Sequence, residues 1–90
     1  METISIYTDK LLIDFTKARQ RALLKAEELL CDPVIIAWKD DKTGRFGPNI
    51  PGKNADRWHD FGVQKGGKLE LNVGEEFHFI ISEAADYEYE

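Results

Sequence analysis

A histidine next to an acid is the pairing in this sequence best suited to chemistry. His59 is followed by Asp60 and preceded by Arg57 and Trp58. A carboxylate beside an imidazole is a common general-base arrangement. The segment from Trp58 to Val63 is predicted to be a strand, however, and neighbours in a strand point to opposite faces. His59 and Asp60 are therefore candidates for a catalytic or ligand-binding cleft only if other groups converge on them. The alternative is that Trp58 anchors the core while its polar neighbours face solvent.

A metal site would need residues that are distant in the sequence to converge in space. The candidate ligands are His59, His78, Cys31, Asp40, Asp41 and Asp60. Neither a His-x-x-x-His spacing nor a pair of cysteines occurs, so no local chelate is predicted. A single cysteine also rules out a disulfide within the chain. We therefore predict no metal and no other cofactor.

Aromatic residues and arginine bracket a segment rich in proline and glycine, from Gly47 to Asn54. The candidate binding patch consists of Trp38, Arg45, Phe46 and Trp58. Tryptophan with a neighbouring arginine is common in protein interfaces and in small-ligand clefts. The alternative is that both tryptophans are core residues of a small domain.

Charge is distributed unevenly along the chain. Lys17, Arg21 and Lys25 are spaced by four and form one face of a predicted helix, whereas residues 69–90 carry seven acids and no base after Lys68. A positive helix face and a negative terminus favour pairing with another copy of the chain or with another protein. The net charge of −5 argues against nucleic acid, which binds clustered Lys and Arg. The alternative is that the basic row is a solvated helix face.

Length and composition predict one globular domain over residues 1–90. A chain of 90 residues cannot support two independent cores. Its 42% hydrophobic and 32% charged residues are typical of a folded protein. No apolar run is long enough to span a bilayer and no secretory signal is evident, so we expect a cytoplasmic protein. Residues 84–90 are acidic with little apolar content and are expected to fray.

One amphipathic helix is predicted over residues 15–30. Asp14 is a suitable N-cap, and Pro33 disfavours helix geometry just before it. An apolar stripe recurs at spacings of three and four and should cover a sheet. The stripe consists of Phe15, Ala18, Ala22, Ala26 and Leu29. Its small alanines allow the helix to lie close to the sheet.

Strands are predicted from β-prone runs and alternation. The predicted strands are Thr3 to Tyr7, Val34 to Trp38, a return strand starting at Arg45, and three meandering strands at Trp58 to Val63, Lys68 to Val73 and Glu76 to Ile81. Alternation in the last two strands places one set of side chains toward the helix. That set consists of Leu69, Leu71, Val73, Phe77, Phe79 and Ile81. The place of the first strand is open, and parallel pairing with the second strand is one choice.

Three segments resemble a family of small prokaryotic proteins classed as a domain of unknown function. They are Asp32-Pro33-Val34-Ile35-Ile36-Ala37-Trp38, Asp41-Lys42-Thr43-Gly44-Arg45-Phe46 and Gly66-Gly67-Lys68-Leu69. The likeness covers about residues 15–81 and rests on hairpin and turn residues. It implies one compact α+β domain without an assigned activity.

The predicted fold is α+β, with one amphipathic helix on one face of a mostly antiparallel sheet of four to six strands. The preferred function is a small noncatalytic binding or interaction module that self-associates. A small enzyme or ligand-binding protein with a cleft near His59 and Asp60 is the first alternative. Nucleic-acid binding by the basic helix face is the second.

Overall fold

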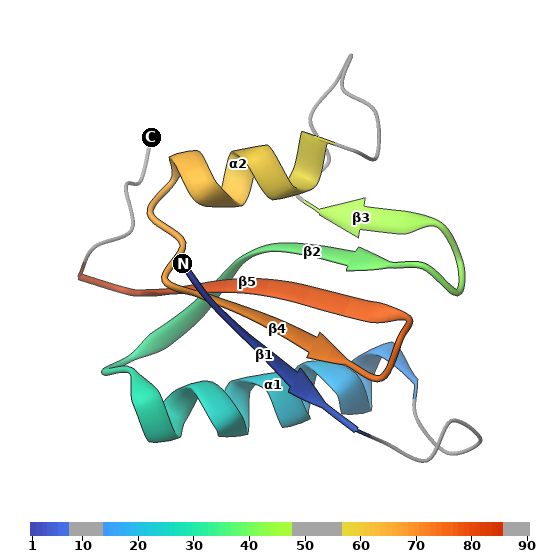
Figure 1. Ribbon diagram of the computed structural model, residues 1–90, viewed down its shortest axis with the longest axis horizontal. Coiled ribbons are helices and arrows are strands. Elements are labelled where there is room, and N and C mark those ends of the chain that lie inside the picture. Colours follow the sequence, from blue (N-terminus) through green and yellow to red (C-terminus); the bar gives the residue numbers. More distant parts are fainter. Residues whose placement is uncertain (8–13, 48–56, 86–90) are drawn as a thin grey trace.

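The computed structural model describes residues 1–7, 14–47 and 57–85, which form two helices and one five-stranded sheet (Figure 1). The elements are β1 (Glu2–Ile6), α1 (Phe15–Leu29), β2 (Pro33–Asp40), β3 (Arg45–Gly47), α2 (Trp58–Gln64), β4 (Leu69–Val73) and β5 (Phe77–Glu83). The strand order is β1-β4-β5-β2-β3. The β1–β4 pair is parallel, and the other pairs are antiparallel. The fold is therefore α+β, as predicted, with β1 and β3 at the two edges.

Helix α1 forms where the capping and the apolar spacing predict it. The Asp14 carboxylate accepts a hydrogen bond from the Lys17 backbone N–H at 2.9 Å, which satisfies one free donor of the first turn. The helix ends at Leu29, one residue earlier than predicted, because Leu30 has extended backbone geometry. The chain then reverses through Asp32 at a positive φ of 48°, ahead of Pro33. Aspartate tolerates this left-handed geometry better than most side chains.

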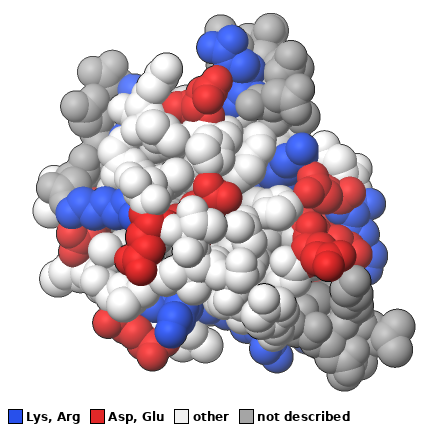
Figure 2. Space-filling view, viewed as in Figure 1, with Lys and Arg blue, Asp and Glu red and all other residues white. Residues whose placement is uncertain are grey.

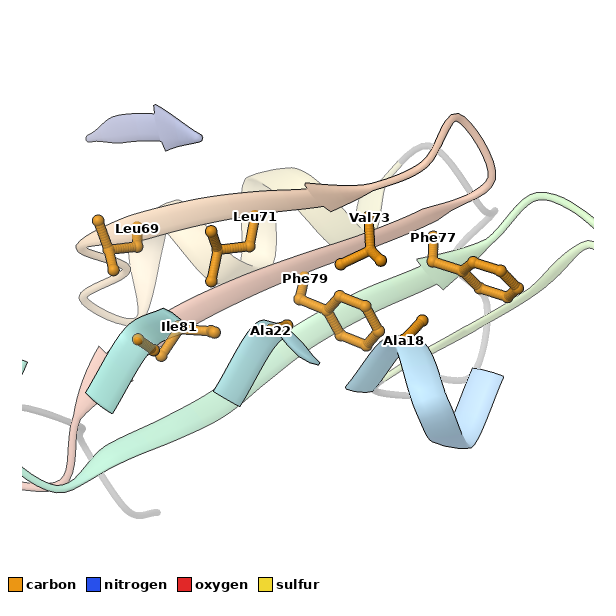
Figure 3. Packing of buried hydrophobic residues seen from close by; sticks show 9 residues of the cluster. Ala18, Ala22, Leu69, Leu71, Val73, Phe77, Phe79 and Ile81 are labelled. Atoms are coloured by element: carbon orange, nitrogen blue, oxygen red, sulfur yellow. The ribbon is translucent and has the colours of Figure 1, made fainter. Parts of the chain in front are cut away.

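The main core lies between α1 and the sheet, and its buried members are among the residues that the helical stripe and the strand alternation predict (Figure 3). They are Ala18, Ala22, Ala26, Leu69, Leu71, Val73, Phe77, Phe79 and Ile81. The three helix alanines are fully buried, so the helix axis lies close to the strands. Phe15 fills the space at one end and packs against Trp38 with ring centroids 4.7 Å apart. Leu29 does not belong to this core: it is 48% exposed, and Leu30 packs there instead.

The β2–β3 hairpin closes through a buried acid. Asp40 accepts from the Lys42 backbone N–H at 2.9 Å and from the Thr43 hydroxyl at 3.0 Å. Gly44 takes a positive φ of 79°, which a glycine adopts without strain. The predicted reversal before Arg45 is thereby confirmed, and the Asp40 carboxylate stabilises it.

The predicted strand from Trp58 to Val63 is wrong, because this segment is helix α2 on the other face of the sheet (Figure 1). Trp58 and Phe61 are three residues apart, so a helix directs both to one side, where they pack with Ile80. Gly62 allows the close approach, since a Cβ there would lie 2.6 Å from Cδ1 of Ile80. Of the three predicted meandering strands, only the two that form the β4–β5 hairpin are present in the sheet.

Strand β1 pairs with β4 in parallel, not with β2. Its place at the edge leaves β4 and β5 between β1 and β2. The predicted loop from Gly47 to Asn54 and the predicted acidic tail over residues 84–90 fall largely outside the described residues. Neither described helix is long and apolar enough to cross a membrane.

Candidate functional site

The sheet face under α2 carries a row of polar side chains. Strand register aligns Ser5 with Asn72, Asn72 with His78, and His78 with Lys39, so the row crosses four strands. Helix α2 covers the neighbouring apolar part of this face, which centres on Ile80. One face of the sheet therefore has both an apolar half under a helix and a polar half beside it.

His78 lies at the centre of this row with both ring nitrogens engaged. Its Nδ1 lies 2.7 Å from Asn72 Oδ1 and its Nε2 lies 2.8 Å from Asp41 Oδ2. Burial acts to raise the pKa of Asp41, but hydrogen bonds from His78 and Lys39 outweigh it, and the pKa falls below its ordinary value. His78 therefore links β5 to β4 and to the turn after β2, and both of its nitrogens are occupied by these structural contacts.

His59 pairs with an acid from another element. Its Nε2 lies 2.7 Å from Oε1 of Glu70, whose side chain is only 19% exposed. A carboxylate on one ring nitrogen fixes the tautomer and leaves the other nitrogen as an acceptor. Among the residues that the structure describes, no hydrogen bond reaches Nδ1 of His59. The pair has the geometry of a general base or of a ligand contact.

The indole of Trp58 lies beside both histidines. Its ring centroid is 5.5 Å from that of His59, edge to face, and 6.3 Å from that of His78. The two histidines thus share one region of the α2 face, although they are far apart in the sequence. We call the group Trp58, His59, Glu70, Asn72, His78 and Asp41 the histidine cluster.

Other predicted site residues do not converge there. Asp60 turns toward Arg57, with 3.6 Å between its Oδ2 and the Arg57 Nε, and not toward His59. Trp38 lies on the α1 face, where it contacts Phe15 and leaves no room for a side chain at Gly47.

The four residues of the predicted binding patch are therefore divided between two faces. Phe46 pairs with Lys39 across the hairpin, and Lys39 pairs with His78, so Phe46 shares the α2 face with Trp58. Arg45 is exposed next to Phe46, whereas Trp38 faces α1. A single surface cannot use both tryptophans.

The predicted absence of a metal stays a prediction, although two of the candidate ligands, His78 and Asp41, are in contact. Within residues 1–7, 14–47 and 57–85, no group of three His, Cys, Asp or Glu side chains could hold a metal ion. Asp40 is committed to the hairpin turn. Cys31 is exposed, and its backbone N–H donates to the Glu83 carboxylate.

A second candidate surface is a groove between β1 and α1. Its volume is about 460 Å³, and it is lined by Ile4, Ser5, Ile6, Arg21, Leu24, Lys25 and Glu28. Leu24 is 64% exposed there, and it adds a large apolar side chain to the surface of the helix. Along β1 the surface is mostly uncharged, and charged residues lie mainly at the margins of this face (Figure 2).

The basic row of α1 lies beside this groove. Lys17 and Arg21 are exposed. The Lys25 Nζ lies 3.7 Å from Oε2 of Glu28, which follows one turn later in the helix. Arg21 and Lys25 line the groove, but Lys17 does not. The row is therefore not a uniform basic surface, because an acid lies next to its last member.

A model of a domain of unknown function (DUF5619) matches residues 1–81. The chain belongs to the DUF5619 family. No curated protein matches it.

A solved structure shows the same fold as this DUF5619 domain. It is the crystal structure of the novel protein AF1514 from Archeoglobus fulgidus, which is 22% identical to this chain. The match has a TM-score of 0.80 and covers 100% of this chain and 98% of the other. At this identity the likeness extends to the fold and not to a function.

Sequence reasoning missed two features of this DUF5619 domain. Glu70, the partner of His59, was visible only as a polar residue alternating with leucines in a strand. The groove depends on β1 lying at the sheet edge, and strand order cannot be read from the spacing of apolar residues. The one available signal was the pattern of Glu2–Ile6, which has two isoleucines but neither Lys nor Pro.

Proposed function

We propose that this DUF5619 domain is a noncatalytic interaction module that self-associates, with the β1 edge and the adjoining groove as its binding surface. The observation that carries the proposal is an edge strand without lysine or proline directly beside a groove whose apolar lining is Ile4, Ile6 and Leu24. Binding by strand addition uses such a pair of features: the edge supplies backbone hydrogen bonds and the groove accepts side chains.

The hydrogen bonds of β1 identify which backbone groups are free to bind. The Glu2 N–H donates to Lys68 O at 3.3 Å, and Ile6 O accepts from the Gly74 N–H at 2.8 Å. Backbone groups alternate in direction along a strand, so Thr3 and Ser5 direct theirs away from β4. Within the described parts of the chain no hydrogen bond reaches these outward groups, so they can pair with a sixth strand.

The two edges of the sheet differ in how well they are protected. Natural sheets blunt their edges with short strands, lysine, proline or bulges. Strand β3 spans only Arg45–Gly47, and Pro48 follows it in the sequence. Strand β1 spans five residues, Glu2–Ile6, and contains neither lysine nor proline. The β1 edge is therefore the one suited to association.

The groove supplies the apolar part of the surface. Ile4 and Ile6 face the α1 side, where they pack against the core at its margin. Leu24 extends the apolar surface on the helix. Strand pairing with these contacts makes a small interface, so we expect association that reverses on dilution.

Light scattering after size exclusion tests this proposal with two matched substitutions. Leu24→Glu places a charge in the groove and should shift the protein toward the monomer. Leu29→Glu changes another exposed apolar residue of α1 that does not line the groove, and it should leave the mass unchanged. A wild-type protein that is monomeric at high concentration in both low and high salt would overturn the proposal.

A second candidate function is a small enzyme or ligand-binding protein centred on His59. It is favoured by the 2.7 Å contact with Glu70, which leaves one ring nitrogen as an acceptor. Asp60, the partner first considered, takes no part because it pairs with Arg57. The remaining ring nitrogen would serve as a general base or bind a hydrogen-bond donor.

Hydrolysis of p-nitrophenyl acetate, a neutral ester probe, tests this second candidate. His59→Gln and Glu70→Gln should both reduce the rate relative to wild type. His78→Gln serves as the matched control, because both nitrogens of His78 are already engaged. Equal rates for His59→Gln and wild type would remove the candidate.

Nucleic-acid binding by Lys17, Arg21 and Lys25 has less support. Lys25 is close to Glu28, and Arg21 borders a groove with apolar walls. Affinity for a phosphate backbone depends on clustered cations, which a neighbouring acid weakens.

A further inference from the structure

We infer that the occupant of the β1 edge is a second copy of this chain, docked antiparallel about a two-fold axis that passes beside Ile4. The inference rests on the proposed function and specifies its partner and its register. Three features of the described residues support it: the direction of the backbone groups, the placement of apolar side chains and the positions of charge.

The backbone groups of β1 are matched to an antiparallel copy. With Ile4 opposite Ile4 of the second copy, Thr3 lies opposite Ser5 of that copy. Thr3 and Ser5 are the two residues whose N–H and C=O groups point outward. They form a hydrogen-bonded pair, and the symmetry repeats it on the other side of the axis. Every outward backbone group of these two residues is satisfied.

Apolar side chains meet at the centre of the same arrangement. Ile4 forms a non-hydrogen-bonded pair with its own symmetry mate, and such pairs bring side chains close together. Both isoleucines lie on the α1 side, in the groove that also contains Leu24 of each copy. The docking therefore covers apolar surface on both copies.

Helix direction fixes where the charges of the groove lie. Strands β1 and β2 run in the same direction, because β1 is parallel to β4, β4 is antiparallel to β5, and β5 is antiparallel to β2. The intervening α1 must therefore run opposite to β1, as Figure 1 shows. Because Arg21 precedes Glu28 in α1, Arg21 lies toward the Ile6 end of β1 and Glu28 lies toward the Glu2 end.

Antiparallel docking then joins opposite charges. Glu2 is exposed and shares the α1 side with Ile4 and Ile6, since these residues alternate in the strand. In the two-fold arrangement, Glu2 of the second copy lies opposite Ile6 and thus near Arg21. Arg21 of the second copy lies in turn near Glu2, so each interface holds the contact twice.

Parallel docking of the same two edges fails on geometry. In a parallel ladder, each residue forms hydrogen bonds with the two residues that flank the residue opposite it. In an unshifted parallel pair, the residues that flank Thr3 and Ser5 direct their backbone groups away from the partner. The outward groups of Thr3 and Ser5 would therefore need a register shifted by one residue. A two-fold pair cannot contain such an offset, because both copies must make the same contacts. Parallel docking of like edges also turns the second sheet over, which places the two Leu24 side chains on opposite faces. The antiparallel arrangement has neither defect.

Disulfide trapping tests the register. In a Cys31→Ser background, Ile4→Cys should cross-link under mild oxidation, because residues in a non-hydrogen-bonded pair have Cα atoms about 4.5 Å apart. Thr3→Cys alone should not, because it is offset by two residues from its own mate. A mixture of Thr3→Cys and Ser5→Cys should cross-link again, and only between the two variants.

Charge reversal gives a second test that does not depend on cysteine. Glu2→Lys and Arg21→Glu should each weaken association at least several-fold, measured by the dilution at which half of the protein is monomeric. The double variant Glu2→Lys/Arg21→Glu should recover most of the wild-type association. Lys17→Glu, on the same helix but outside the groove, should have little effect.

The outcomes separate this inference from the proposed function. A wild-type monomer overturns both. A dimer that Leu24→Glu disrupts but that gives no Ile4→Cys cross-link and no charge rescue overturns the two-fold register alone. A dimer that cross-links through Ile4→Cys and is rescued by the double variant supports both.

Discussion

The two faces of the sheet are built differently. The α1 face carries the main apolar core, in which three buried alanines meet the side chains of β4 and β5. The α2 face is divided: α2 covers a small apolar cluster around Ile80, and the rest is a polar row crossing four strands. The difference indicates that the α1 face supplies most of the stability, whereas the candidate functional groups lie on the α2 face and at the β1 edge.

The largest effect should come from a charge placed in the α1 face. Ala22 has no exposed surface, and Ala22→Glu would bury a carboxylate without a partner. We expect a loss of more than about 4 kcal/mol in the free energy of unfolding, measured by urea denaturation. Arg19→Glu, on the exposed side of α1, is the control and should change stability little. A mild effect of Ala22→Glu would contradict the packing described for α1.

A smaller effect is expected in the apolar half of the α2 face. Gly62→Ala gains helix propensity, but its Cβ would meet Ile80 at 2.6 Å. We expect a net destabilisation of about 1–2 kcal/mol. Ile80→Val shortens the opposing side chain, so the double variant should be more stable than the sum of the single effects predicts. Strict additivity would show that Gly62 does not pack tightly on Ile80.

The smallest effect belongs to the polar half of that face and depends on pH. Burial acts to raise the pKa of Asp41, but His78 and Lys39 lower it below its ordinary value of 3.8 in the folded protein. A lowered folded pKa means that the stability contributed by Asp41 is complete above the unfolded value and is lost as pH falls through the folded value. Asp41→Asn should therefore be less stable than wild type near neutral pH, and the difference should shrink as the pH falls below about 4.

Thermal melts from neutral to acid pH measure this difference. The matched control is Asp60→Asn, which changes an exposed acid outside the histidine cluster. It should melt close to wild type throughout the pH range. A gap between Asp41→Asn and wild type that widened toward acid pH would contradict the contact with His78.

Regular periodicity explains what could be predicted from the sequence. The alanine stripe of α1 and the alternation in β4 and β5 identify their own buried faces, because 3.6- and 2-residue periods each direct one set of side chains to one side. Asp14 and Pro33 mark the ends of the helix by local chemistry. The prediction that Leu29 faces the core is wrong, because the helix ends at this residue and the chain turns. The turn directs Leu30 inward instead.

Helix α2 could not be predicted in the same way. Its aromatic and β-branched residues favour a strand, and Gly62 lowers helix propensity. Tertiary packing decides the outcome, since only a helix directs Trp58 and Phe61 together onto Ile80. The spacing of three between these two aromatic residues is typical of a helix. One such pair is too little evidence to outweigh the strand preference of the surrounding residues.

The candidate sites depend on strand order, which the sequence leaves open. His59 meets Glu70 of β4 only because α2 packs on the sheet against β2 and β5. The groove exists only because β1 lies outside β4 and not beside β2. Both features join residues that are distant in the chain, so no local pattern encodes them.

The most direct test of the central claim is the solution mass of wild type and Ser5→Pro, measured by light scattering over a dilution series. Proline at Ser5 removes an outward N–H and spares the ladder to β4. We predict a wild-type dimer that dissociates on dilution and a Ser5→Pro monomer with an unchanged circular dichroism spectrum. A wild type that is monomeric throughout, or a Ser5→Pro variant that dimerises as well as wild type, would contradict the claim.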